Sequence, residues 1–436
     1  MPPRTGPREL DSRAPGFAAA FEELLHAKRE ASEDVGRDVA LIIAKVRAEG
    51  DAALIELTRR FDRFDPSESL AIGPAEIARA RAAVPKETLG ALELAAERIE
   101  TFHARQKPAD LLYRDALGVT LGQRWTPVDA AGLYVPGGTA AYPSSVLMNA
   151  LPARVAGVER RVMCVPTPDG QVAPLVLAAA ALAGITEIWR VGGAQAIAAL
   201  AYGTQSIRPV DKIVGPGNAW VAAAKRQVFG QVGIDSIAGP SEILVLADAG
   251  SDPSWIAADL LSQAEHDSSS QSILISTDAA LLRAVVAEAE RHLTRLPRAK
   301  IARASWETLG ATILVGDWAE AAELANRLAP EHLELAVEHP EEILPFIRHA
   351  GAIFLGRHTP EALGDYLAGP NHVLPTARTA RFASGLSVFD FLKRSSLIGC
   401  PADALLSLAP AAIRLAEAEG LDAHALSLAL RLPKNG

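Results

Sequence analysis

The spacing of apolar positions divides the chain into segments of two kinds. Up to about residue 110, apolar residues recur with the 3.6-residue period of helices over 17–29, 35–49 and 87–102. From about residue 119, short runs rich in β-branched residues alternate with alanine-rich segments of helical period. Strands that alternate with helices are typical of βαβ units and parallel sheets, so the pattern predicts an α/β fold.

The alternating region falls into two sets of elements, and no repeat of the sequence itself relates them. In the first set we expect strands at 132–135, 162–165, 187–191, 212–214 and 243–246, with helices near 144–156, 173–184, 193–202 and 217–229. In the second set we expect strands at 272–275, 311–315 and 351–355, with helices near 278–295, 317–328 and 341–349. Residues 402–432 again have helical period. We therefore expect two incomplete Rossmann-like modules with parallel sheets, and helical appendages at both ends of the chain.

A helix between the two sets is predicted to end at a pair of polar side chains. Asp252 is suited to cap this helix and Pro253 to occupy its first turn. Gln263 and His266 follow with i,i+3 spacing, which places two potential metal ligands on one helix face. The helix dipole also favours a histidine in a last turn, so the pair alone leaves a metal site and a simple helix end both open.

Glycine-rich turns follow three strands of the first set: Pro136-Gly137-Gly138, Gly192-Gly193 and Gly215-Pro216-Gly217-Asn218. In open α/β sheets, ligands bind beyond the carboxyl ends of the strands, where helix N-termini favour phosphate. Tyr134, Gln195 and Asn218 lie beside these turns and are candidates to contact a nucleotide. No GxGxxG motif follows a strand, and ordinary turn chemistry with Asn218 as a helix cap stays open as the alternative.

Carboxylates and histidines stand close together in three further segments: Glu331 with His332, Asp365 with His372, and Glu419 with His424. An imidazole such as His332 can remove a proton at neutral pH, and the carboxylate of Glu331 beside it can orient a water. A solvated pair in a loop is the alternative for these two residues. The pair nearest the C-terminus would by itself indicate ordinary surface residues.

Composition narrows the choice of partners. The net charge is −9 at pH 7 and no basic block occurs, which argues against nucleic acid or an anionic membrane and favours a small-molecule substrate. No uncharged apolar run approaches the ~18 residues that a membrane span needs. Residues 1–16 lack the apolar centre of a secretory signal, so a cytoplasmic location is expected. The two cysteines, Cys164 and Cys400, are too few for a disulfide framework or a cysteine-based zinc site.

From about residue 30 onward, the chain resembles the histidinol dehydrogenase family. The segments that carry the resemblance are YVPGGTAAYPSSVLMNA (134–150), VGGAQAIAALAYGT (191–204), KIVGPGNAWV (212–221), AGPSEILVLAD (238–248), LLSQAEHDSSSQ (260–271), NRLAPEHLEL (326–335), GDYLAGPNHVLPT (364–376) and the stretch 419–424. The resemblance implies an enzyme that depends on zinc and NAD. It implies the oxidation of L-histidinol through L-histidinal to L-histidine, the last steps of histidine biosynthesis.

The resemblance also implies a role for each candidate residue. One Zn²⁺ per subunit would be held by Gln263, His266, Asp365 and His424. The acid–base pair would be Glu331 and His332. Substrate would be held by Ser241, His372 and Glu419 together with the zinc ligands and His332. The residues that contact NAD would be Tyr134, Gln195 and Asn218.

The same resemblance implies a homodimer with shared active sites, in which the neighbouring chain supplies Glu419 and His424. The expected organisation is an N-terminal helical arm (1–29), a larger α/β domain with the zinc ligands and the acid–base pair (30–133 plus 242–386), a Rossmann-like NAD domain (134–241) and a helical dimerisation segment (387–436). A short helical appendage buries little apolar surface unless it packs on something larger, which favours packing on a partner.

Three alternatives differ from this reading in what they require of the sequence. A related dehydrogenase of another polar alcohol would change the residues that bind imidazole, whereas His372 and Glu419 are both present. A nucleotide-sensing or scaffold protein without catalysis would tolerate loss of the Glu331–His332 pair, which is retained. A cysteine-dependent aldehyde dehydrogenase would need an exposed, activated thiol, whereas Cys164 lies in an apolar run.

Overall fold

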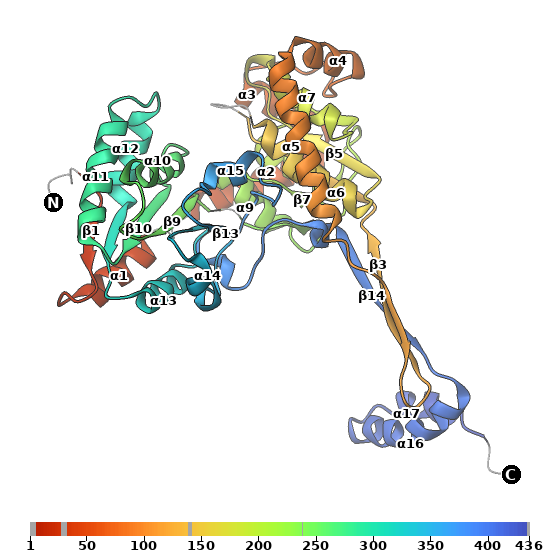
Figure 1. Ribbon diagram of the computed structural model, residues 1–436. Helices are drawn as coiled ribbons and strands as arrows, with labels where there is room; N and C mark the ends of the chain where they lie inside the picture. Colours follow the sequence, from red (N-terminus) through yellow and green to blue (C-terminus); the bar gives the residue numbers. More distant parts are fainter. Residues whose placement is uncertain (1–5, 28–32, 138–141, 238, 434–436) are drawn as a thin grey trace. The chain divides into compact units, whose positions relative to one another are not determined.

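The computed structural model describes residues 6–27, 33–137, 142–237 and 239–433 (Figure 1). They form two compact units. The first comprises Met1–Gln106 and Asp129–Phe391, and the second comprises Lys107–Val128 and Leu392–Gly436. Two parallel sheets lie in the first unit and one antiparallel sheet lies in the second. None of the helices in the described ranges is long and apolar enough to cross a membrane.

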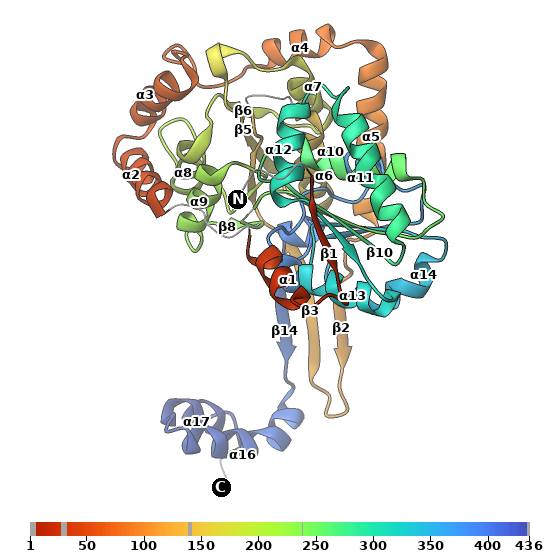
Figure 2. The same ribbon diagram turned by 90° about the vertical axis from the view of Figure 1, so that its left-hand side faces the viewer.

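The five-stranded sheet has the order β6-β5-β4-β7-β8. Its strands are β4 (Ala130–Tyr134), β5 (Arg160–Cys164), β6 (Glu187–Trp189), β7 (Lys212–Val214) and β8 (Gly233–Ile234). Helices cover both faces (Figure 2). On one face lie α2 (Glu33–Glu49), α3 (Asp51–Asp62), α8 (Gly193–Tyr202) and α9 (Ala219–Val228). On the other lie α4 (Pro74–Ala83), α5 (Lys86–Ala104), α6 (Pro143–Ala156) and α7 (Pro174–Leu182).

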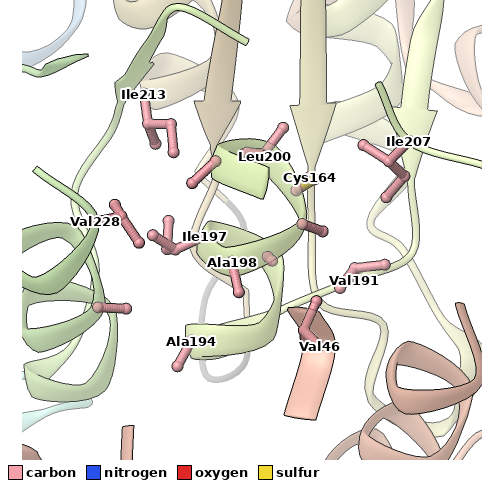
Figure 3. Packing of buried hydrophobic residues seen from close by; sticks show 14 of the residues in the cluster. Val46, Cys164, Val191, Ala194, Ile197, Ala198, Leu200, Ile207, Ile213 and Val228 are labelled. Atoms are coloured by element: carbon pink, nitrogen blue, oxygen red, sulfur yellow. The ribbon is translucent and has the colours of Figure 1, made fainter. Parts of the chain in front are cut away.

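The core on the α8 face of this sheet joins three layers of the fold (Figure 3). Leu200 of α8 points toward the strands, where Ile213 of β7 lies, Ile197 lies on the side of α8 that faces α9, and Val46 reaches the cluster from α2. All four side chains are fully buried. Alanine recurs along α8, and its small side chain lets α2 and α9 approach this helix closely.

The six-stranded sheet has the order β1-β11-β10-β9-β12-β13. Its strands are β1 (Arg8–Asp11), β9 (Glu242–Ala247), β10 (Gln271–Ser276), β11 (Ala311–Leu314), β12 (His332–Ala336) and β13 (Ala352–Leu355). The helices on one face are α10 (Pro253–Ala264), α11 (Ala279–Leu293) and α12 (Ala299–Leu309), and those on the other are α1 (Phe17–His26), α13 (Trp318–Leu328) and α14 (Pro340–Ile343) (Figure 2). A further helix, α15 (Glu361–Tyr366), follows β13.

Both parallel sheets are wound in the same way. The first strand of each module, β4 or β9, has the next two strands on one side and the last two on the other, and in the six-stranded sheet β1 adds beyond β11. The order in which strands are added therefore reverses between β4 and β7 in one sheet and between β9 and β12 in the other. The expected α/β fold with two Rossmann-like modules is confirmed. The shared winding is a repeat of topology, which the sequence does not reveal.

Three details differ from the sequence expectation for the first unit. Arg8–Asp11 is a strand and not part of a helical arm, because it pairs with β11, and four residues carry too little periodicity to show this. The strand predicted at 243–246 is β9, which belongs to the second sheet and not to the first, because it pairs with β10 and β12. The helix expected at 341–349 is shorter, and a 3-10 turn that contains Pro345 follows α14.

The second unit consists of three strands and two helices. The strands are β2 (Leu111–Arg114), β3 (Thr120–Pro127) and β14 (Leu392–Gly399), in the order β14-β3-β2, and the helices are α16 (Ala402–Ala418) and α17 (Asp422–Ala429). β14 pairs with β3 along its whole length, from Leu392 opposite Pro127 to Gly399 opposite Thr120. The expectation that residues 387–436 are all helical is therefore wrong, because β14 lies within them. Residues 107–128 are grouped with it.

Candidate active site

Two of the glycine turns described above meet beside the point where the five-stranded sheet changes direction. Tyr134 ends β4, and its buried hydroxyl accepts a hydrogen bond from the backbone N–H of Gly193, at 3.1 Å, where α8 begins. Burial raises the pKa of Tyr134 to about 12, so this hydroxyl stays protonated near neutral pH. Gln195 is buried in the first turn of α8. Tyr134 and Gln195 thus lie at the carboxyl edge where such sheets bind nucleotides.

A buried ion pair fixes the third turn, which follows β7. Gly215 has a φ of +119°, and a Cβ atom there would lie 2.1 Å from the carbonyl oxygen of Tyr134, so only glycine fits. Lys225 Nζ donates to the carbonyl of Gly215 at 3.0 Å, and Asp235 Oδ2 accepts from its N–H at 2.8 Å. Lys225 and Asp235 also pair with each other, with side chains only 3% and 4% exposed. Both polar groups of Gly215 are therefore held by side chains.

Asn218 caps α9 at the end of this turn. Its Oδ1 accepts hydrogen bonds from the N–H groups of Trp220, at 3.1 Å, and Val221, at 3.2 Å. The residue itself is exposed. The cap that the sequence left open as an alternative is therefore present, and it leaves Asn218 on the surface beside the turn.

The Glu331–His332 pair lies at the amino end of β12, away from the carboxyl edge where the switch-point rule places ligands. His332 Nδ1 is 3.0 Å from the carbonyl oxygen of Glu242 and 2.9 Å from Oε1 of Gln263. Both of these oxygens accept, so Nδ1 carries the proton and Nε2 presents a lone pair. Burial lowers the pKa of His332 to about 4, so the imidazole is neutral near pH 7.

Glu331 and His332 are held by the same neighbouring residue. Glu331 Oε2 accepts a hydrogen bond from the backbone N–H of Glu242 at 2.9 Å, while His332 uses the carbonyl of Glu242. Both side chains are buried, and Glu331 Oε2 is 3.9 Å from His332 Nδ1. The pairing of β12 with β9 therefore fixes the carboxylate and the imidazole relative to each other.

Gln263 connects His332 to the end of α10. Its Nε2 donates to His266 Nδ1 at 3.0 Å while its Oε1 accepts from His332, so the two imidazoles and the amide form one chain of hydrogen bonds. Gln263 is fully buried and is the penultimate residue of α10, whereas His266 is exposed just beyond the helix. The i,i+3 spacing thus places both side chains on one side, as the sequence predicts.

Two carboxylates of α15 face the free nitrogen of His332. Glu361 Oε1 is 3.7 Å from His332 Nε2, and ligand atoms of His332, Glu361 and Asp365 lie within 4.8 Å of one another. Burial, followed by the charge of Asp365, raises the pKa of Glu361 to about 8. Glu361 Oε1 is buried and has no hydrogen-bond partner among the residues that the structure describes. A bound cation would offset the cost of burying these two carboxylates in their charged form.

Asp365 also contacts His372. Nδ1 of His372 is 3.1 Å from the carbonyl oxygen of Asp365 and 3.6 Å from its Oδ1, while Nε2 is 3.5 Å from Oγ of Ser145 on α6. Burial opposes ionisation of Asp365, but the hydrogen bond and charge of His372 and the other imidazoles outweigh it and lower the pKa. Asp365 is therefore ionised near neutral pH and faces several imidazoles.

Six of the predicted residues gather in this cluster: Gln263, His266, Glu331, His332, Asp365 and His372. Ser241 directly precedes β9, and its carbonyl accepts from the N–H of Gln271 at 3.0 Å. Glu419 follows α16 and His424 lies in the first turn of α17, both exposed in the second unit. The roles of all these residues stay predictions.

Sequence reasoning missed Glu361 and Ser145. Glu361 lies four residues before Asp365 and directly after Pro360, so helical spacing in a Pro-started turn could have placed both carboxylates on one face. Ser145 gives no such signal, because only the tertiary contact with His372 distinguishes it from other serines.

Comparisons with known proteins identify the family. The family model described as histidinol dehydrogenase matches residues 25–432. Histidinol dehydrogenase of Cereibacter sphaeroides is 63% identical over 429 residues, covering 98% of this chain and 99% of the relative. That of Rhodospirillum rubrum is 61% identical over 428 residues, with coverage of 98% and 99%. The crystal structure of histidinol dehydrogenase from Elizabethkingia anophelis superimposes with a TM-score of 0.93 at 36% identity and covers 98% of each chain.

Proposed function

The chain belongs to the histidinol dehydrogenase family of NAD-linked oxidoreductases, and we propose that it oxidises L-histidinol to L-histidinal and then to L-histidine. The observation that carries the proposal is the pair of hydrogen bonds at Nδ1 of His332. Its Nδ1 is committed to two acceptors, which leaves a neutral Nε2 with a free lone pair in a cluster of buried carboxylates.

His332 Nε2 is the atom suited to remove protons. In the first oxidation it takes the hydroxyl proton of histidinol while the adjacent carbon loses a hydride. Once it has released that proton to solvent, it takes a hydroxyl proton of the aldehyde hydrate in the second oxidation, and the same carbon loses a second hydride. NAD, when bound, accepts the hydride in each oxidation. The hydrogen bonds at Nδ1 keep the ring oriented through both oxidations.

Glu331 is suited to prepare the water that hydrates the aldehyde. Its carboxylate is fixed by the N–H of Glu242 and buried beside His332, so one oxygen can accept a proton from water next to the reacting carbon. The carboxylate and the imidazole thus divide the work between hydration and proton removal. No cysteine is required, because the hydrate replaces a thiohemiacetal.

The donor set also fits a zinc ion. We propose that Gln263, His266 and Asp365, with His424 of the partner subunit, hold one Zn²⁺, since zinc accepts nitrogen and oxygen ligands. The fit is supported by the contact between Gln263 and His266 and by the buried oxygen of Glu361 beside Asp365 that has no donor. Zinc, when bound, supplies a cationic centre that holds the amino and imidazole nitrogens of the substrate.

For NAD we propose the carboxyl edge of the five-stranded sheet, with contacts from Tyr134, Gln195 and Asn218. Support comes from the turn at Gly215, whose backbone packs closely against the end of β4 at this edge, and from the protonated hydroxyl of Tyr134. The edge lies where the sheet changes direction, between β4 and β7.

We further propose a homodimer, located in the cytoplasm, in which each chain lends Glu419 and His424 to its neighbour. The second unit supports this, because its buried apolar residues on α16 and α17 are alanines. Twelve of its larger apolar side chains are exposed: Leu111, Leu112, Tyr113, Leu117, Leu397, Ile398, Leu406, Leu408, Leu415, Leu421, Leu426 and Leu430. Such a surface needs a covering partner.

The proposed reaction fixes a stoichiometry. Purified protein incubated with L-histidinol and NAD is expected to form two molecules of NADH for each molecule of L-histidine, since each oxidation transfers one hydride. The measurement pairs NADH absorbance with amino-acid analysis. One NADH per histidinol with accumulation of the aldehyde, or no turnover of histidinol at all, would contradict the proposal.

Removal of the metal is expected to abolish turnover until zinc is restored, because the zinc ion is proposed to hold the nitrogens of the substrate. Binding of the metal itself depends on the deprotonated ligand set. Asp365→Asn should lower the zinc content of the purified protein, measured by plasma mass spectrometry. Asp278→Asn is a matched control, since Asp278 caps α11 away from the cluster and asparagine also caps. Full activity in a preparation shown to be free of metal would end the zinc proposal.

The variant with both cysteines replaced by alanine is expected to keep both oxidations. Cys164 is fully buried in β5, where burial raises the pKa of its thiol, and Cys400 is exposed in the second unit. Loss of the buried sulfur should lower the melting temperature slightly. The assay follows NADH formation from histidinol and from histidinal separately. A folded variant that stops at the aldehyde would contradict the absence of a cysteine nucleophile.

A further inference from the structure

A proline inside α6 leaves one helical carbonyl without its usual partner. Pro152 has no N–H, so the carbonyl of Met148, four residues earlier, receives no hydrogen bond from the helix. Both residues are buried. The side-chain amide of Asn371 donates to this carbonyl at 2.6 Å, from 223 residues further along the chain. A buried acceptor that would otherwise be unsatisfied is thereby paired.

The same asparagine stands next to His372, for which the family resemblance implies substrate binding. Asn371 is 6% exposed, and its Oδ1 accepts from the N–H of Val373 at 2.9 Å. One amide group therefore ties the backbone beyond His372 to α6. His372 itself reaches Oγ of Ser145, which lies one turn before Met148 on the same helix.

α6 thus contacts the segment of Asn371 and His372 at two points one turn apart. The i,i+3 spacing of Ser145 and Met148 puts both on one face of the helix. The hydroxyl of Ser145 lies 3.5 Å from the His372 ring, a long contact that orients it weakly. The shorter bond to Asn371, at 2.6 Å, is the firmer one.

We propose that Asn371 is a positioning residue for His372, anchored on the carbonyl that Pro152 leaves free. The inference rests on the proposed function and on the substrate-binding role that the family resemblance implies for His372. Asn371 does not touch substrate itself. It acts by holding the His372 imidazole in position. Loss of Asn371 should therefore weaken the binding of histidinol more than it changes kcat or the binding of NAD.

Asn371→Leu removes the donor while keeping a side chain of similar length. The KM for L-histidinol is expected to rise about 10-fold, with kcat and the KM for NAD within about twofold of wild type. The melting temperature should fall by about 1 to 3 °C, because the Met148 carbonyl stays buried without a partner. An unchanged KM for histidinol in this variant would overturn the inference.

A second variant separates positioning from stability. In Pro152→Ala/Asn371→Leu, the new N–H at position 152 can pair with the Met148 carbonyl, so the melting temperature should recover. The KM for histidinol should stay raised, because nothing restores the anchor of His372. Pro152→Ala alone should match wild type in both measurements. Recovery of the KM together with stability would show a merely structural role and overturn the inference.

A spectroscopic readout distinguishes failure of this inference from failure of the proposed function. In protein labelled with ¹⁵N-histidine, the His372 imidazole signals are identified by their loss in His372→Gln. They should shift in Asn371→Leu and in the double variant but not in Pro152→Ala, without any substrate present. A wild-type protein that does not oxidise histidinol would refute the proposed function, whereas unshifted signals would refute the positioning role.

Discussion

Replacing His332 by asparagine is expected to slow the oxidation of both L-histidinol and L-histidinal by about 100-fold or more. Asparagine can still donate a hydrogen bond toward the Glu242 carbonyl or Gln263, but it has no basic nitrogen in the place of Nε2. Both oxidations release a hydroxyl proton, so both should suffer. The fold should persist because the anchoring contacts are partly kept.

Glu331→Gln is the companion variant, and its effect should be unequal. The glutamine oxygen can still accept the N–H of Glu242, so the side chain stays in place while its charge is lost. Hydration of the aldehyde should fall by about 100-fold, whereas oxidation of the alcohol should fall by less than about 10-fold. Single-turnover experiments started from histidinol and from histidinal resolve the two steps.

His292 offers a matched control for these variants. It is partly buried on α11 and bonded to Ser254, outside the cluster, so His292→Asn should leave both oxidations within about twofold of wild type. The assignment of roles fails if His332→Asn and Glu331→Gln both have mild and equal effects on the two steps.

Mixing two inactive variants is expected to restore activity. Homodimers of His424→Ala and of His332→Asn should each be nearly inactive, one for loss of a zinc ligand and one for loss of the base. In a heterodimer with shared sites, both lesions fall in one site and the other site is whole. After complete exchange of subunits at equal amounts, activity should reach about one quarter of wild type, since half of the dimers carry one intact site.

The matched control is a mixture of His332→Asn with Glu331→Gln. These residues belong to the same chain's part of the site, so each site of the heterodimer keeps one lesion and activity should not rise above the mean of the two parents. Subunit exchange is verified by native mass spectrometry of differently tagged chains. If the first mixture also stays inactive after verified exchange, then His424 acts within its own chain and the shared-site proposal is wrong.

The parts of the site that were predictable from sequence are those whose residues are neighbours along the chain. Gln263 and His266 share a helix end, and Glu331 and His332 are adjacent, so local geometry alone puts each pair together. What brings the two pairs together is the parallel pairing of β12 with β9. Strand order is decided by tertiary packing, and no periodicity in the sequence encodes it.

The fold divides in the same way. Strands buried on both faces, such as β9 and β10, have continuous apolar runs that the sequence shows clearly. In the second unit, β2 and β14 are exposed along most of their length, β3 is half-buried, and all three mix charged with apolar residues, so their pattern does not distinguish them from loops. Their pairing became visible only in the structure.

The pairing of β1 with β11 has a consequence for the order of folding during synthesis. The five-stranded sheet uses residues 130–234, so all of its strands exist well before β11 leaves the ribosome. β1 is made first of all but has no partner until residue 314 has been added. During that interval it is an unpaired edge segment, the kind of segment that invites association between chains. Its sequence, RELD, is charged at all positions but one, which opposes such association while the partner strand is awaited.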